Sequence, residues 1–201
     1  MPAFPTDITP QSVTGFDMPG SLSARSHGGV LNFRDSTAVG RSWSMTYFSD
    51  VTSANFKKLM TIVRQYHREG TTFTVQHPDY LTPTGAVAGG TPVVQGGSQT
   101  GSSLIIDGAS NSITGWLKAG DLFTMTGINH AFEVTADVTS TGSGTVTLPI
   151  SPSIYSGGSP ADNATLVVTG VTINSYVDSY DMPTTNANNY GRLRVTFVEK
   201  V

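Results

Sequence analysis

The chain has 201 residues, a formal net charge of −3 and a pI of about 5.7. This slightly acidic net charge argues against the basic surface by which most proteins bind nucleic acid. The chain has no cysteine, which excludes disulfides, thiol catalysis and thiolate metal sites. Charged residues make up only 12% of the chain, about half the usual share. This low charge favours a protein whose surface is partly buried in an assembly.

The N-terminal residues carry neither a basic region nor an apolar core, so we expect no signal peptide. No apolar run approaches the roughly 18 residues of a membrane helix, and we expect the protein to be made in the cytoplasm without membrane contact. Residues 1–22 are rich in Pro and Gly. They predict an extended arm that orders when it meets a partner.

Two segments with strand character follow the arm, at residues 29–35 and 40–48. In the second, Trp43, Met45 and Tyr47 alternate with Ser and Thr. A period of two is typical of a strand with one buried face. The three large side chains are therefore expected to lie in the core.

A single helix is predicted over residues 53–69. Thr52 or Ser53 can cap its first turn, and Gly70 supplies the left-handed stop. Apolar residues at helical spacing form one stripe: Phe56, Leu59, Met60, Val63 and Tyr66 or His67. Residues 71–77 follow at once as a strand, so the helix is expected to pack across a sheet.

The composition changes after Thr82. Residues 83–103 are rich in glycine and carry no charge, which predicts a linker or a long flexible loop. Residues 104–170 contain short strand-like runs separated by turn residues, as in a small barrel or sandwich. The last segment, GRLRVTFVEKV, alternates like residues 40–48, and we expect these two strands to share a sheet.

Together these patterns predict a mainly β protein. Residues 1–82 and 171–201 would form a β-sandwich braced by the one helix. Residues 83–170 would form an inserted small all-β domain, preceded by the glycine-rich linker.

The order of these elements resembles that of distal tail proteins, the baseplate adaptors of long-tailed bacteriophages, and of related minor tail proteins. The resemblance depends on RSWSMTYF, SANFKKLMTIVRQYHREG, TTFTVQHP and the closing GRLRVTFVEKV. The segment WLKAGDLFTMTGINHAFEVTADVTSTGSGTVTLPISPSI also resembles a β-module of phage virion proteins.

This resemblance implies a non-enzymatic structural subunit without a cofactor or metal. It implies a homo-oligomeric ring, commonly a hexamer, that joins the tail tube to the host-recognition apparatus of hub and fibre proteins in the virion. The helix would then brace the sandwich and present basic side chains to acidic neighbours. These candidate interface residues are Lys57, Lys58, Arg64 and Arg68.

Other interpretations remain open at this stage. The protein could be a carbohydrate-binding module on the virion surface, with Trp116 as an exposed ligand contact, or another virion protein: a tail terminator, tube, connector or decoration subunit. A hydrolase triad can be assembled from Ser26, His27 and Asp35, but no G-x-S-x-G elbow accompanies it. The four histidines are too widely spaced to predict a metal site.

Overall fold

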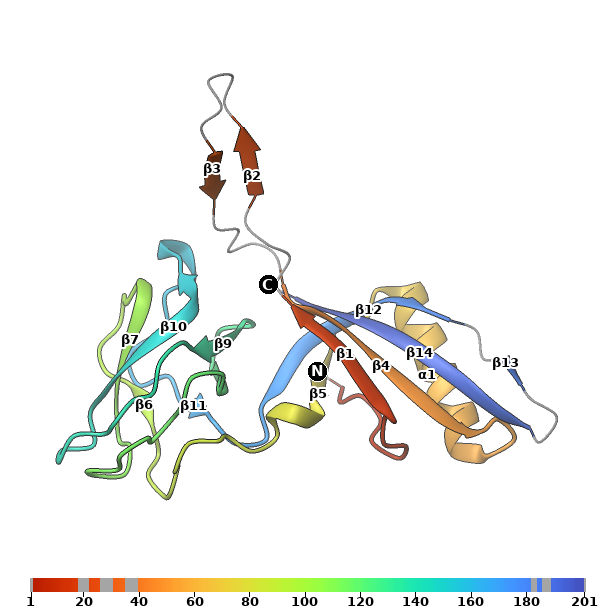
Figure 1. Ribbon diagram of the computed structural model, residues 1–201, viewed down its shortest axis with the longest axis horizontal. Coiled ribbons are helices and arrows are strands. Elements are labelled where there is room, and N and C mark those ends of the chain that lie inside the picture. The colour runs from red at the N-terminus through yellow and green to blue at the C-terminus, as the bar shows by residue number, and fades with distance from the viewer. Residues whose placement is uncertain are drawn as a thin grey trace. The chain divides into compact units, whose positions relative to one another are not determined.

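The computed structural model describes residues 2–17, 22–25, 31–34, 40–181, 184–185 and 189–200. The chain divides into two compact units (Figure 1). Unit 1 comprises Met1–Val75 and Asn174–Val201, and unit 2 comprises Gln76–Ile173. The predicted fold class, mainly β with one α-helix, is confirmed.

Unit 1 is built on one antiparallel sheet whose central strands are the two predicted from their shared pattern. Strand β4 (Ser42–Asp50) pairs with β14 (Tyr190–Glu199) along nearly its whole length. The strand order is β1-β4-β14-β12-β5. The other strands of this sheet are β1 (Ser12–Asp17), β5 (Phe73–Gln76), β12 (Thr172–Tyr180) and β13 (Thr184–Thr185), of which β13 pairs with β14.

The side chains of β14 alternate between a buried and an exposed face. Leu193, Val195 and Phe197 of β14 are fully buried, whereas Arg192 and Arg194 between them are exposed. The predicted core positions Trp43, Met45 and Tyr47 of β4 are likewise buried. Burial also raises the pKa of the Tyr47 hydroxyl.

Helix α1 (Ala54–Glu69) covers the apolar face of this sheet (Figure 1). Ser53 caps the helix with its Oγ, which accepts a hydrogen bond from the backbone N–H of Phe56 at 3.2 Å. Gly70 ends it in the left-handed conformation, at φ 60°. The predicted apolar stripe is buried: Phe56, Leu59, Met60 and Val63. Tyr66 stacks on Phe73 of β5, with ring centroids 4.9 Å apart, which fixes the helix on the sheet.

A separate two-stranded antiparallel ribbon is formed by β2 (Leu22–Arg25) and β3 (Leu31–Arg34). Strand β3 falls within the segment 29–35 that the sequence predicts to be extended.

Unit 2 is a second six-stranded sheet that closes on itself. The strand order is β11-β8-β9-β10-β7-β6, and the two ends meet where Val93 bridges Thr165. Further backbone hydrogen bonds, such as Val94 N–H to the Ala164 carbonyl at 2.9 Å, close the gap, which gives a small barrel. Its strands are β6 (Val93–Val94), β7 (Gly101–Asp107), β8 (Leu122–Met125), β9 (Ala131–Val134), β10 (Val146–Ile154) and β11 (Leu166–Val167); short 3₁₀ turns lie at Pro78–Tyr80 and Ser156–Gly158.

The glycine-rich segment 83–103, predicted to be a linker, is instead a folded part of this barrel. It contains β6 and the start of β7, and Val94 is fully buried in the core. Its glycines allow close backbone packing, because a Cβ on Gly85 would lie 2.4 Å from the Trp116 carbonyl oxygen and one on Gly90 2.5 Å from that of Gly108. Composition alone does not distinguish glycines needed for close approach from glycines that give flexibility.

Candidate assembly interface

The exposed side of α1 carries the four basic residues predicted as interface positions, and all four are exposed. Lys57, Arg64 and Arg68 are separated by seven and then four residues, so they lie along one side of the helix. Lys58 lies about 100° around the helix axis from Lys57. The four residues therefore form one row of three cations with a fourth on its flank.

Lys57 and Arg64 flank an open depression of about 410 Å³ beside the helix. Apolar atoms of Val51, Phe56 and Met60 contribute to its lining, together with Thr61. A depression with a partly apolar lining and basic margins suits a partner segment with an apolar side chain and a carboxylate nearby.

Lys58 and Arg68 are engaged within the subunit. The Lys58 Nζ lies 2.6 Å from the Asp7 Oδ2 of the N-terminal arm, and the Arg68 Nη2 lies 3.4 Å from the Glu69 Oε1. All four side chains of these pairs are substantially exposed, and exposed ion pairs contribute little to stability. The structure thus separates the predicted cations into Lys57 and Arg64, which line the depression, and Lys58 and Arg68, which do not.

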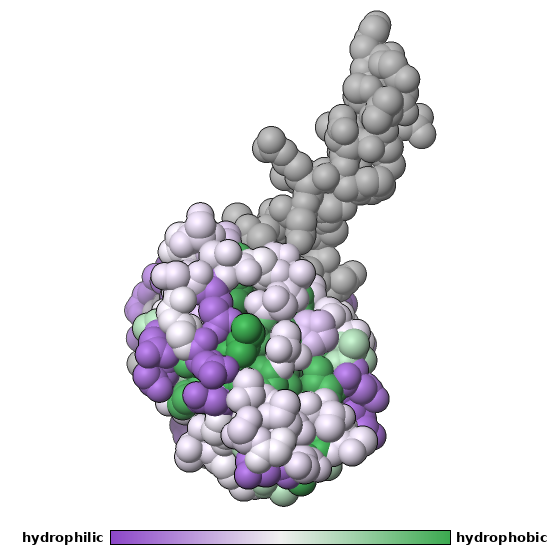
Figure 2. Space-filling model, turned by 90° about the vertical axis from the view of Figure 1, so that its left-hand side faces the viewer, coloured by the Kyte–Doolittle hydropathy of each residue, from purple (hydrophilic) through white to green (hydrophobic). Residues whose placement is uncertain are grey.

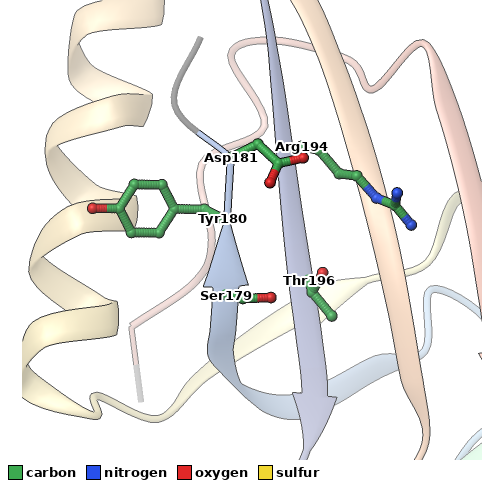
Figure 3. A pocket seen from close by; sticks show the side chains of 5 residues that line it. All are labelled: Ser179, Tyr180, Asp181, Arg194 and Thr196. Carbon is green, nitrogen blue, oxygen red and sulfur yellow. The ribbon is translucent and has the colours of Figure 1, made fainter.

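The opposite face of the unit 1 sheet holds a polar depression of about 210 Å³ (Figure 3). Ser179, Asp181, Arg194 and Thr196 line it together with Tyr180, whose ring turns toward the helix (Figure 3). There the Tyr180 ring meets the His67 ring edge-on, at 5.3 Å between centroids. The Arg194 guanidinium points away from Asp181 (Figure 3), which leaves its donors directed outward.

An aromatic pair lies on this same outer face. Phe48 of β4 and Tyr190 of β14 stack at 5.6 Å between centroids, and each is 45% exposed. Arg192, the cross-strand partner of Phe48, lies beside them. The alternation of β4 places Phe48 opposite the core face. The exposed pair of Phe48 and Tyr190 could have been predicted only by aligning β4 with β14 in the correct register.

Trp116 is not an exposed ligand contact. It is fully buried in the core of unit 2, and its backbone N–H donates to the Val138 carbonyl at 2.8 Å. The expectation was wrong because Trp116 was interpreted as a residue at an open turn, whereas the folded segment 83–103 packs against it through Gly85.

The exposed aromatic of unit 2 is Tyr155, which is 56% exposed. Its ring lies against the backbone of the 3₁₀ turn Ser156–Gly158: a Cβ on Gly157 would come within 2.9 Å of the ring and one on Gly158 within 2.5 Å. Neither glycine has a positive φ, so the ring, rather than the backbone conformation, explains why glycine occupies these positions.

Figure 2 shows a face of unit 2 on which hydrophobic surface lies between strongly hydrophilic patches.

The residues considered for catalysis and metal binding lie partly outside the described part of the chain. Ser26, His27 and Asp35 lie outside the described residues. Of the other histidines, His67 is exposed on α1 while His77 and His130 are buried. Within the described ranges, no group of three or more potential metal-ligating side chains is found, and no helix there is long and apolar enough to cross a membrane.

Comparison with protein families gives a match over residues 80–170 to the B domain of distal tail protein pb9. The matched segment coincides with most of unit 2. Comparison with curated proteins gives no match. The resemblance to distal tail proteins of long-tailed phages, stated from the sequence, is thereby confirmed, and the match indicates a structural role in a phage tail.

Proposed function

We propose that the protein is a distal tail subunit whose unit 1 assembles into a ring, commonly hexameric, between the tail tube and the host-recognition apparatus of the virion. The observation that carries this proposal is the match of residues 80–170 to a distal tail protein domain. The subunit would act through shape and self-association, with tube, hub and fibre proteins as partners.

The surfaces of unit 1 support this role. A ring of identical subunits joins two different surfaces of each subunit at every interface. Unit 1 offers such surfaces on its two sides: the depression beside α1, with Lys57 and Arg64 at its margin, and the outer sheet face, with Phe48 and Tyr190. Exposed aromatics and arginines are the side chains that most often dominate protein interfaces.

The first experiment is native mass spectrometry of the purified chain, with negative-stain imaging of the same sample. A closed ring is expected. The double charge reversal Lys57→Glu, Arg64→Glu should reduce the ring fraction by at least tenfold at a fixed concentration. The matched variant Lys58→Glu, Arg68→Glu changes the charge equally but affects cations that do not line the depression, and should have a smaller effect. Equal effects of both variants would count against the depression as an interface.

A second candidate function is carbohydrate binding by unit 2, and Tyr155 favours it. Its ring is held against glycine backbone and exposes more than half of its surface. A rigid exposed aromatic can stack on an apolar sugar face at small entropic cost. Glycan-array screening tests this idea: binding that Tyr155→Ala abolishes and Tyr190→Ala preserves would support it, whereas no binding to any glycan would argue against it.

A further inference from the structure

The N-terminal arm lies along an edge of the unit 1 sheet, which it joins through a single β-bridge. Ala3 forms a parallel bridge with Thr74 of β5. The backbone N–H of Phe4 donates to the Thr74 carbonyl at 2.9 Å, and the Thr74 N–H donates to the Pro2 carbonyl at 3.0 Å. The arm thereby pairs the edge strand β5, which is otherwise the last strand on that side.

Phe4 anchors this short strand in the core. It is only 6% exposed. Its ring lies 5.2 Å from the ring of Phe73 and 5.0 Å from that of Phe197, measured between centroids. The edge of β5 is therefore a site shaped for an extended segment with one aromatic side chain, and the chain's own N-terminus fits it.

The arm connects this site with the opposite edge of the sheet. It leads into β1, which begins at Ser12 on the opposite edge from β5. Four strand spacings separate β1 from β5, a path of about 19 Å along a flat sheet. Residues 5–11 make this crossing, and all of them are exposed or partly exposed. Outside the segment, Asp7 forms an exposed ion pair with Lys58, and the Gln11 N–H donates to the Thr46 carbonyl.

We propose that in the assembled ring the N-terminal arm is exchanged, so that Phe4 of each subunit occupies the β5 edge of a second copy of this chain. This inference rests on the proposed ring. In a head-to-tail ring, two different surfaces of each subunit lie against its two neighbours. If the β1 edge of one subunit faces the β5 edge of the next, an arm that starts at β1 reaches the neighbouring β5 without crossing a sheet.

Exchange preserves the contacts that residues 2–4 make with the β5 edge. The same two backbone hydrogen bonds and the same Phe4 burial form between subunits instead of within one, which is why identical elements exchange readily between protomers. The exchange also explains why a Pro-rich segment with little packing of its own carries a buried phenylalanine, Phe4.

Cysteine cross-linking tests the exchange, because the native chain has no cysteine. Ala3→Cys and Thr74→Cys, prepared as separate proteins, are mixed under conditions that dissociate and then reform the oligomer, and treated with a short bismaleimide. Covalent dimers of Ala3→Cys with Thr74→Cys are expected. Ala3→Cys mixed with Thr147→Cys, an exposed position on β10 of unit 2, measures random collision and should give at least tenfold less dimer.

The outcomes separate the exchange from the ring itself. Rings with cross-linked dimers support both proposals. Rings without such dimers, together with internal cross-linking in a chain that carries both Ala3→Cys and Thr74→Cys, overturn the exchange and leave the ring proposal intact. A protein that stays monomeric in native mass spectrometry and gives no dimers overturns both. As a second variant, a chain lacking residues 1–5 should keep its circular dichroism spectrum but lose rings; unchanged ring formation would contradict the exchange.

Discussion

Arg41 and Glu199 form a buried ion pair where β4 begins and β14 ends. The Arg41 Nη1 lies 3.3 Å from the Glu199 Oε2, and the two side chains are 2% and 0% exposed. The backbone N–H of Arg41 donates to the same oxygen at 3.0 Å. The Arg41 guanidinium also lies 5.5 Å from the centroid of the Phe16 ring. The ion pair therefore links the start of β4 to the end of β14, the two central strands of the unit 1 sheet.

Glu199→Ala should destabilise unit 1 strongly, because it leaves the Arg41 charge buried without its carboxylate. Removing one partner of a buried ion pair costs about 3–5 kcal/mol of unfolding free energy. Urea unfolding followed by Trp fluorescence measures the change. The control is Glu69→Ala, which breaks the exposed Arg68–Glu69 pair and should cost less than about 1 kcal/mol. Similar losses in both variants would show that the buried pair has no special role.

Asp121→Ala should destabilise unit 2. The Asp121 side chain is almost completely buried, and its two oxygens accept hydrogen bonds from the Thr84 N–H and hydroxyl, the Gly85 N–H and the Lys118 N–H, at 2.6 to 3.0 Å. Hydrogen bonds to a charged group contribute about 1.5–3 kcal/mol each, and the orphaned donors add a penalty. We expect a loss of roughly 3 kcal/mol or more.

Asp137→Ala is the matched control for Asp121. Asp137 is exposed and accepts a hydrogen bond from the Ala119 N–H at 3.0 Å. Its loss should cost about 1 kcal/mol. Urea unfolding of both variants provides the comparison, and a smaller loss for Asp121→Ala than for Asp137→Ala would refute the role given to the buried carboxylate.

The sequence predicts local structure well where short-range signals determine it. Helix α1 has a serine cap, an apolar stripe and a terminal glycine within one segment, and the structure places it at Ala54–Glu69, close to the predicted 53–69. The β4–β14 pairing was also predictable, because both strands carry the same alternation.

Long-range packing was not predictable in the same way. Segment 83–103 has the composition of a linker, but its glycines fit against Trp116 and Gly108, which are distant in sequence. The same cause explains the error on Trp116, whose burial depends on that segment. The exposed pair of Phe48 and Tyr190 depends on strand register, which brings together residues far apart in the chain.

Phe48→Ser with Tyr190→Ser should weaken assembly while leaving the fold intact. Both rings are about half exposed and stack mainly on each other, so their loss removes little buried surface within the subunit. We expect a change of about 1 kcal/mol or less in unfolding free energy and a drop of at least tenfold in the ring fraction. The control Ile105→Ser changes an exposed apolar residue of unit 2 and should leave the rings unchanged. Rings that survive the double substitution would exclude this pair from the interface.

Acidification should destabilise unit 2 through His77. This side chain is only 2% exposed, and burial lowers its pKa from the ordinary 6.5, against a smaller opposing effect of the Asp79 carboxylate. Because the unfolded chain binds a proton more readily than the folded one, the neutral histidine favours folding above pH 6.5, and this contribution is lost as the pH falls through the folded pKa. The melting temperature of unit 2 should therefore fall as the pH is lowered from 7.5 to about 5.

His77→Gln is the variant that isolates this effect, because glutamine does not titrate. It removes the hydrogen bond that the His77 Nδ1 accepts from the Asp79 N–H at 3.3 Å, so the variant should be less stable at pH 7.5 but should show a flatter dependence of melting temperature on pH. His67→Gln, at an exposed position on α1, should keep the slope of the native chain. Calorimetric scans at half-unit pH steps measure all three proteins, and a His77→Gln slope as steep as the native one would assign the acid sensitivity to other groups.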